Sequence, residues 1–482
     1  MHIQEKIRVI NQIEAKGFDE FTFDEVNWWP LIRIYLFENH NINDSRESSK
    51  NDLKKSSKIE LGYFKRVLWD LRVLKGIFYK KKKLNVAGSQ IYKKCDYAFV
   101  SNSNNYKLNF EKKWINRYID PLFIETKEKK NLFIRGTKYI DNEYVVNSAQ
   151  SIDYLEQKLL FKKQYNLLLR TVFFLKEREK YSVLNIERIT EIIKYLKEYS
   201  ELNNFNFNKL SDWIDIAIYH SEIATILFGK VTPSVFIQYC YYFPMQFGYN
   251  LAASSMKIIS VDYQHGNQNK WHYGYGSWKN VPNNGFSILP NEFWVYSERE
   301  KNNLLKGFKS TPHEVLVKGN YWFNYWRGYK LNNDKLNWVL DKKSEGKKVI
   351  LFTVSSYLLD RDNFFWEYLK TSQDEKTFWL FRLHPAYLNL EDDLKLILKE
   401  CGVSFYNIKE ATNVELYDLL NIIDLHITQN SSVAEEALSF GLKTIILEQE
   451  WSLYFEDYLN EGKMVMPKSV KEFSEILNLY TD

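Results

Sequence analysis

A buried-strand pattern, KVILFT at residues 348–353, opens a regular alternation of apolar strands and amphipathic helices that continues to residue 447. The alternation predicts strands at 348–353, 377–383, 403–406, 425–428 and 444–447, and helices at 364–371, 390–401, 414–420 and 432–440, with a last helix from about residue 470. Parallel strands joined by crossover helices form a doubly wound sheet. We therefore expect a Rossmann-like α/β domain over residues 329–482.

The first half of the chain repeats this pattern less regularly. Strands are predicted at 97–100, 234–239, 257–261, 292–296 and 314–318, and helices at 152–176, 186–199, 208–228 and 243–255. The strand–helix–strand unit between 234 and 261 is a βαβ unit, which makes its strands parallel. We expect a second Rossmann-like domain at 91–328, with a helical insertion at 150–228, facing the first across a cleft.

Length and composition are those of an ordinary globular protein. The 482 residues are 45% hydrophobic and 26% charged, with a net charge of +5, so two or three domains are expected and no overall field favours nucleic acid. The cysteines, Cys95, Cys240 and Cys401, form no CxxC pair, which predicts a reducing compartment without disulfides or a zinc site. GxGxxG, GxxxxGK[ST] and GxSxG are all missing, which disfavours dinucleotide oxidoreductases, P-loop NTPases and α/β-hydrolases.

Residues 1–90 predict a helical extension with a polar linker at 41–58. The segment 61–83 has a basic amphipathic pattern and ends in Lys80–Lys83, so it could lie on an anionic membrane surface or pack as a helix with a solvated basic end. The chain has neither a signal-peptide pattern at its start nor an apolar run long enough to span a membrane. A cytoplasmic protein is expected, and in the first of these two cases residues 61–83 would contact the inner face of the cytoplasmic membrane.

Three polar clusters follow predicted strands. The first is Gln429-Asn430-Ser431-Ser432, which leads directly into a predicted helix. Ser432 and Glu435 have capping-box spacing, which is a purely structural explanation. The functional alternative is a phosphate site, because a helix start offers free N–H groups and the serines add hydroxyl donors. Asn430 would add to that site, and Glu435 could hold ribose hydroxyls.

The second cluster is Arg382-Leu383-His384-Pro385. Proline cannot continue a central strand, which places His384 at the carboxyl edge of the sheet, where its ring could donate to a phosphate. A histidine bonded within a turn is the alternative. Arg382 is a donor-site candidate that could instead face away. Thr353 and Ser355 follow another strand of this domain and are candidates to line the donor pocket.

The third cluster is Asp262-Tyr263-Gln264-His265-Gly266. His265 titrates near neutrality and could take a proton from an acceptor hydroxyl, while Asp262 could orient it or be the base itself. Gly266 would allow a sharp turn beside a ligand, and Gln264 would contact that ligand. A metal site built from Asp262, His265 and His272 is an alternative, but their spacing matches no standard metal signature, so no metal site is expected.

These clusters carry a resemblance to known enzymes. Residues 262–266, the aromatic stretch to Trp278, Leu289-Pro290 and Phe293-Trp294 resemble the "QHG" glycosyltransferases of bacterial capsule and lipopolysaccharide gene clusters. The His384-Pro385 and Ser431-Ser432 pairs are similar to the HP and Ser-Ser motifs of bacterial sialyltransferases and polysialyltransferases, and of teichoic-acid glycerophosphotransferases.

The resemblance covers about residues 95–482 and implies the GT-B fold. Because donors aimed at the leaving phosphate can stabilise the transition state, a metal-independent transferase without a cofactor is expected. The resemblance also implies that His384, Ser431 and Ser432 hold the phosphate of a cytidine nucleotide. Sialyltransferases carry an acidic Asp/Glu-Asp-Gly base motif where this chain has Gln264-His265-Gly266, so a histidine base is closer to the glycerophosphotransferases.

The expected function is synthesis of a bacterial surface polysaccharide. A CMP-activated nonulosonic acid or Kdo would be transferred to a glycan or lipid-linked glycan acceptor. The alternatives are a UDP- or dTDP-sugar transferase, a CDP-polyol phosphotransferase of the teichoic-acid type, and a non-catalytic scaffold of a polysaccharide assembly complex.

Overall fold

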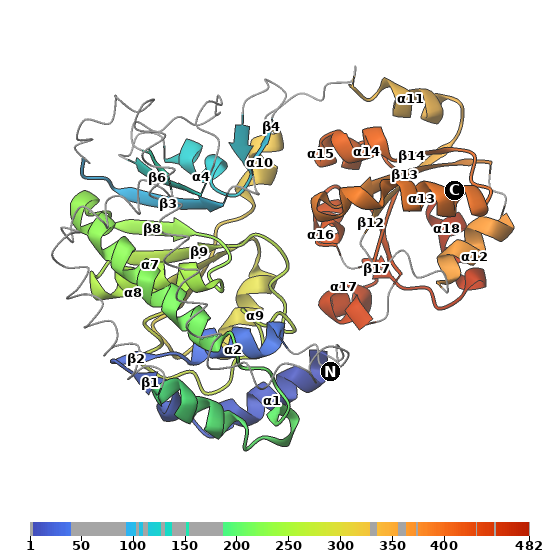
Figure 1. Cartoon of the computed structure of the whole chain (residues 1–482). Helices are drawn as coiled ribbons and strands as arrows, with labels where there is room; N and C mark the ends of the chain where they lie inside the picture. The colour runs from blue at the N-terminus through green and yellow to red at the C-terminus, as the bar shows by residue number, and fades with distance from the viewer. Residues whose placement is uncertain are drawn as a thin grey trace. The chain divides into compact units, whose positions relative to one another are not determined.

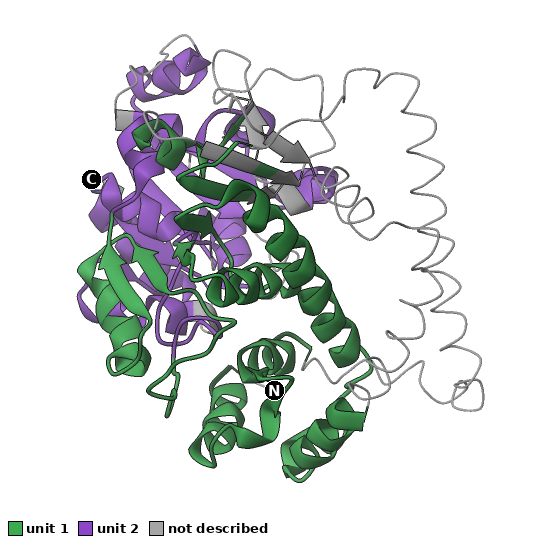
Figure 2. Ribbon diagram, turned by 90° about the vertical axis from the view of Figure 1, so that its left-hand side faces the viewer, with its two compact units in different colours: residues 1–263, 277–318 green, residues 264–276, 319–482 purple. Residues whose placement is uncertain are grey.

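The computed structural model describes residues 3–39, 93–102, 106–108, 114–126, 131–136, 151–153, 187–327, 335–354, 363–372, 375–429, 431–447 and 450–481 (Figure 1). The chain divides into two compact units, coloured separately in Figure 2. Unit 1 comprises residues 1–263 and 277–318, and unit 2 comprises residues 264–276 and 319–482. The segment Gln264–Gly276 thus lies in the range assigned to the first domain from the sequence, yet its contacts belong to unit 2.

Unit 2 is built on one parallel sheet with the strand order β14-β13-β12-β15-β16-β17. Its strands are β12 (Lys348–Val354), β13 (Thr377–Leu383), β14 (Tyr406–Asn407), β15 (Leu425–Thr428), β16 (Thr444–Ile446) and β17 (Met464–Val465). Numbered along the chain, this order is 3-2-1-4-5-6, which is the Rossmann order. The predicted doubly wound sheet is confirmed, although β14 is shorter than expected and β17 was not predicted.

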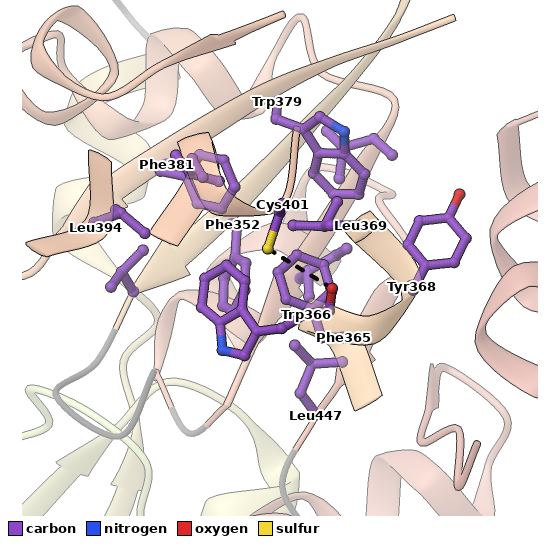
Figure 3. Close-up of a cluster of buried hydrophobic side chains, with 14 of the residues drawn as sticks. Phe352, Phe365, Trp366, Tyr368, Leu369, Trp379, Phe381, Leu394, Cys401 and Leu447 are labelled. Atoms are coloured by element: carbon purple, nitrogen blue, oxygen red, sulfur yellow. Dashed lines mark hydrogen bonds between the residues drawn. The ribbon is translucent and has the colours of Figure 1, made fainter. Parts of the chain in front are cut away.

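One face of this sheet carries the main core of unit 2 (Figure 3). It is covered by α12 (Phe364–Ser372), α13 (Glu391–Glu400) and α18 (Val470–Thr481). Because side chains alternate along a strand, Ile350, Phe352 and Val354 of β12 face these helices. Thr353 points to the other face, where α16 (Val433–Ser439) packs its Ala434 against Ile446.

Unit 1 repeats the same topology with one further strand. Its parallel sheet has the order β11-β10-β9-β8-β3-β6-β7. The strands are β3 (Tyr97–Asn102), β6 (Asn131–Gly136), β7 (Ser151–Asp153), β8 (Val235–Gln238), β9 (Ile259–Tyr263), β10 (Glu292–Val295) and β11 (Glu314–Val317). Helices α7 (Leu210–Val231) and α8 (Pro244–Ser255) cover one face. A Cβ at Gly248 would lie 2.2 Å from Ala217 O, so only glycine permits this close helix packing.

The described N-terminal residues are integrated into unit 1. Helix α1 (Ile3–Ala15) and helix α2 (Trp29–Glu38) flank the hairpin β1 (Thr22–Phe23) and β2 (Val26–Asn27). Glu14 and Arg33 form an ion pair of 2.9 Å with side chains that are 0% and 1% exposed. Such a pair stabilises only when further hydrogen bonds satisfy both groups. Here Trp29 Nε1 and Lys279 N also donate to the Glu14 carboxylate.

The structure corrects several predicted elements. Residues 151–153 form strand β7, so the helix predicted from 152 is wrong at its start, and most of that range lies outside the described residues. Helix α9 (Glu298–Phe308) was not predicted, although Ser297 and Glu300 give a readable capping box. Ser297 Oγ accepts from Arg299 N and donates to Glu300 Oε2 at 2.6 Å. Helix α14 (Lys409–Asn413) was missed as well.

Two Rossmann-like α/β units are thus confirmed, while the cleft between them and the domain boundaries at 90 and 328 stay predictions. The linker at 41–58 and the basic segment at 61–83 lie outside the described residues. In the part of the chain that the structure describes, none of the helices has the length and apolarity to cross a membrane.

Candidate functional site

In unit 2 the strand order reverses between β12 and β15. Doubly wound sheets bind ligands outside the carboxyl ends of their strands, at the point of reversal. The residues predicted from the sequence flank this point: His384 follows β13, and Ser431 and Ser432 follow β15. Since β12 lies between β13 and β15, these strand ends are about 10 Å apart, twice the spacing of neighbouring strands. A nucleotide phosphate group with its ribose can span that distance.

The turn after β15 is fixed by two hydroxyl groups. Thr428 Oγ1 donates to Thr353 O at 3.2 Å and accepts from Ser431 N at 3.2 Å. Ser431 Oγ in turn accepts from the N–H of Val433, the first residue of α16, at 3.3 Å. The Ser431 hydroxyl therefore has a structural task at the point of reversal.

Ser432 is the residue of this turn that is left for a ligand. Its side chain makes no cap hydrogen bond, so the predicted capping box with Glu435 is wrong. Glu435 N bonds to the Ser432 carbonyl instead. Among the described residues, the Ser432 hydroxyl and N–H take part in no hydrogen bond, and the side chain is only half-buried. Two donors are thus available at the position expected for a phosphate.

His384 is exposed directly after β13. Pro385 begins the short helix η8 (Pro385–Leu390), and Tyr387 N donates to His384 O at 2.8 Å. The imidazole lies 5.6 Å from the Tyr387 ring, measured between centroids. An accessible ring at this edge can donate to a phosphate oxygen, which agrees with the placement predicted from Pro385.

Arg382 has a different environment. Its Nη1 donates to Ala411 O at 2.7 Å and to Val414 O at 2.6 Å, both at the carboxyl end of α14. A cation at the end of a helix satisfies carbonyl groups that have no partner within the helix. We therefore assign Arg382 to holding α14 against β13 and leave it out of the proposed donor site.

Thr353 belongs to a buried polar ladder across the sheet. Its Oγ1 lies 3.0 Å from His426 Nε2, and His426 Nδ1 lies 3.1 Å from Thr444 Oγ1. Burial lowers the pKa of His426 to about 3, so the imidazole is neutral and joins both threonines as donor and acceptor. The Thr353 hydroxyl is thus committed to the sheet. Ser355 and Asn430 lie outside the described residues.

Residues Gln264–Gly276, here called the histidine segment, pack onto the helical region that follows β16. Asn267 Nδ2 donates to Tyr454 O at 3.0 Å, and Asn269 Nδ2 donates to the same oxygen. Tyr454 lies in η9 (Glu450–Phe455), which is followed by α17 (Glu456–Asn460). Lys270 Nζ lies 2.7 Å from Glu456 Oε2, and Trp271 Nε1 donates to the same oxygen at 3.1 Å.

The predicted ligand-facing residues of this segment differ in burial. His265 and Gly266 are half-buried, whereas Gln264 is buried and its Nε2 donates to Gly266 O at 2.8 Å. Gly266 lies at a bend of the chain, but it does not have a positive φ and a Cβ there would meet no protein atom within 4 Å, so its place beside a ligand stays a prediction. Glycine is needed instead at Gly276, where a Cβ would lie 2.2 Å from Lys270 O.

Asp262 is placed differently from His265. It lies within β9 of unit 1, is 0% exposed, and its Oδ1 accepts from Tyr241 N at 3.0 Å. The carboxylate thus fixes the loop between β8 and α8. Its role as the base stays a prediction, and its burial favours a positioning task.

Within the described residues, no group of three or more His, Cys, Asp or Glu side chains could hold a metal ion. Three residues that hold the histidine segment were not predicted from the sequence: Asn267, Asn269 and Glu456. The asparagines adjoin the motif, but the partner carbonyl of Tyr454 lies 185 residues beyond Asn269, so no local pattern identifies the pairing.

No protein-family model matches the chain, and no curated protein matches it. Among solved structures it is similar to UDP-GlcNAc 2-epimerase from Neisseria meningitidis bound to UDP-GlcNAc, with 12% identity, 79% of this chain and 89% of that chain covered, and a TM-score of 0.47. The epimerase from Methanocaldococcus jannaschii gives 11%, 80%, 92% and 0.47, and the wall teichoic acid polymerase TagF gives 10%, 85%, 87% and 0.39. Similarity at this level carries no activity over to the chain.

Proposed function

We propose that this chain is a glycosyltransferase of the GT-B type that moves a sugar from a nucleotide donor to a glycan acceptor during synthesis of a bacterial surface polysaccharide. The observation that carries the proposal is the pair of accessible groups at the point of reversal in unit 2. The Ser432 hydroxyl and N–H take part in no hydrogen bond among the described residues. His384 is exposed at the end of β13, the strand next to β12.

The donor phosphate would bind between these groups. Neutral and charged N–H and O–H donors aimed at a leaving phosphate stabilise the charge that develops as the glycosidic bond breaks. Ser431 would shape the turn through its bond to Val433 N, and Glu435, half-buried in the first turn of α16, would reach the ribose. Asn430, Gln264 and Gly266 are further proposed contacts. No metal or cofactor is invoked in this scheme.

His265 would act on the acceptor. In an inverting reaction its imidazole takes the proton of the acceptor hydroxyl while that oxygen bonds to the anomeric carbon and the nucleotide leaves with the bonding electrons. In a retaining reaction the same ring would only orient the acceptor.

The finer proposal concerns the nucleotide. The HP and Ser-Ser motifs support a CMP-activated nonulosonic acid or Kdo, and a histidine in place of an acidic base supports the CDP-polyol phosphotransferase as the second candidate. Peripheral membrane contact through 61–83 would bring the enzyme to a lipid-linked acceptor.

Thermal unfolding with CMP, CDP, UDP and dTDP tests the proposal. A nucleotide present at 100 times its Kd stabilises the protein by about 2.7 kcal/mol. We expect stabilisation by CMP; stabilisation by CDP alone selects the second candidate, and stabilisation by UDP or dTDP moves the donor to those sugars. A protein that none of the four stabilises has no donor site of this kind.

The variant His384→Ala ties the effect to the site. Loss of a hydrogen bond to a charged phosphate should weaken nucleotide binding about tenfold or more. Lys395→Ala on α13 is the control, because Lys395 pairs with Glu391 and Asp392 at the surface, and these are its ion pairs among the described residues. Equal affinities in both variants would remove His384 from the site.

A further inference from the structure

We infer that Asn267, Asn269 and Glu456 are positioning residues that fasten the histidine segment to η9 and α17, and so set where His265 stands. The inference rests on the proposed function, since it gives a catalytic meaning to the position of His265. It adds residues to which neither the sequence motifs nor the proposed mechanism assigned a task.

The fastening consists of two pairs of bonds that converge on two acceptors. The side-chain amides of Asn267 and Asn269 both donate to the backbone oxygen of Tyr454. Lys270 and Trp271 both reach Glu456 Oε2, at 2.7 and 3.1 Å. Four consecutive or near-consecutive residues, just beyond His265, therefore contact one short stretch of unit 2.

The same asparagines also fold the segment on itself. Asn267 Oδ1 accepts from Asn269 N at 2.9 Å, and Asn269 Oδ1 accepts from Trp271 N at 2.9 Å and His272 N at 3.1 Å. Each asparagine therefore uses its oxygen for the shape of the segment and its nitrogen for the attachment. Gly276 closes the far end, since Gly276 N donates to His272 O at 2.7 Å.

The attachment leads toward the proposed donor site. Tyr454 packs against the cluster of Ala434, Ile446 and Phe455, which joins η9 to α16 and β16. Ser432 immediately precedes α16. The bonds to Tyr454 therefore connect His265 to the same helix whose start carries the proposed phosphate contact. A reacting group displaced by about 1 Å can lose about 100-fold in rate.

Because the oxygen and the nitrogen of the Asn269 amide have different partners, one substitution can remove the attachment and leave the internal bonds of the segment in place. Asn269→Asp keeps the oxygen that accepts from Trp271 N and His272 N but replaces the donor to Tyr454 O by an acceptor. We expect hydrogen exchange in residues 264–276 to rise and kcat to fall between about tenfold and about 100-fold. Nucleotide Kd, measured with CMP, CDP, UDP and dTDP, should stay within about twofold of wild type, because the donor contacts are untouched.

A second experiment changes Glu456 and uses Glu345 as its matched control. Glu456→Ala should lower kcat, and Glu456→Gln should restore part of it, since the amide oxygen still accepts from Trp271. Glu345→Gln changes another Glu that pairs with a lysine in unit 2, at 2.6 Å from Lys342, and should leave turnover unchanged. Turnover would be followed with CMP-N-acetylneuraminate, UDP-N-acetylglucosamine and dTDP-rhamnose.

The outcomes separate this inference from the proposed function. Unchanged exchange in Asn269→Asp shows that the attachment does not hold the segment, and raised exchange with unchanged kcat shows that it does not position His265; either result overturns the inference. Equal losses in kcat and nucleotide affinity also overturn it, since the segment would then belong to the donor site. A wild-type protein that binds no nucleotide defeats the proposed function, whereas these variant results concern the attachment alone.

Discussion

The two sheets share the strand order 3-2-1-4-5-6, but they differ in how far the polar side chains at their carboxyl edges are buried. In unit 1 two polar side chains near the carboxyl ends of β8 and β9 are buried: Asp262 accepts from Tyr241 N, and Gln238 Nε2 donates to Asn250 Oδ1 at 2.7 Å. In unit 2 the corresponding edge leaves His384 exposed and Ser432 half-buried. Topology therefore indicates where a ligand can bind, and burial decides which edge has donors to offer.

Loss of a polar group should have different effects at the two edges, on stability in unit 1 and on ligand binding in unit 2. Removing a buried polar partner in unit 1 leaves another polar group unsatisfied, so the loss appears in the free energy of unfolding. Removing the Ser432 hydroxyl in unit 2 breaks no hydrogen bond among the described residues, so the loss appears in ligand binding. Substitutions of buried groups in unit 1 should therefore reduce stability most, and substitution of Ser432 in unit 2 should reduce it least.

The largest effect is expected for Glu14→Ala. The change leaves the Arg33 guanidinium, which lies 4.2 Å from the Trp278 ring, buried without its carboxylate. Breaking a buried pair in this way costs about 3–5 kcal/mol, whereas replacing both partners by apolar residues is often neutral. Urea unfolding should show the loss in Glu14→Ala and a partial recovery in Glu14→Leu/Arg33→Met, because Trp29 Nε1 and Lys279 N still lose their acceptor. A loss below about 1 kcal/mol would show that the pair is not a structural element of unit 1.

The next effect is expected for Asp262→Ala. Loss of the charged acceptor of Tyr241 N should lower the free energy of unfolding by about 1.5–3 kcal/mol. Asp262→Asn keeps an oxygen acceptor and should lose less. Full stability in Asp262→Ala combined with abolished turnover would instead identify Asp262 as the catalytic base and contradict the structural interpretation of the unit 1 edge.

The sequence predicted both parallel sheets and the strand ends that the candidate residues follow, but strands β6, β7 and β17 were not predicted. Alternating apolar strands and helices predict both parallel sheets, and Pro385 predicts the edge position of His384 because a proline ends a central strand. The different roles of Ser431 and Ser432 were not predictable, because the capping-box spacing with Glu435 pointed to Ser432, whereas in the structure Ser431 Oγ accepts from Val433 N. Pairings such as Asn269 with Tyr454 depend on tertiary contacts that leave no local pattern.

The stability of the fold should depend on pH through His426, which is buried in β15 of unit 2. Its pKa is lowered to about 3 by burial, while an unfolded histidine titrates near 6.5. Between these values the unfolded chain binds a proton that the folded chain does not, so stability falls as the pH drops below about 6.5, by up to about 1.4 kcal/mol for each pH unit. Urea unfolding at pH 7, 6 and 5 should show a steeper loss in wild type than in His426→Gln. Parallel pH profiles for the two proteins would show that the His426 proton is not excluded.

The smallest effect on stability is expected for Ser432→Ala, and this result would sharpen the comparison most. Its hydroxyl serves no bond among the described residues, so the free energy of unfolding should change by less than about 0.5 kcal/mol. Nucleotide affinity should nevertheless fall about tenfold, the cost of one hydrogen bond to a charged group. Ser439→Ala, at the other end of α16, is the control, because its Oγ donates to Glu435 O at 3.2 Å and lies beyond the proposed site. A loss of stability without a loss of affinity in Ser432→Ala would make the unit 2 edge as structural as that of unit 1, and the accessible donor would have to be sought elsewhere.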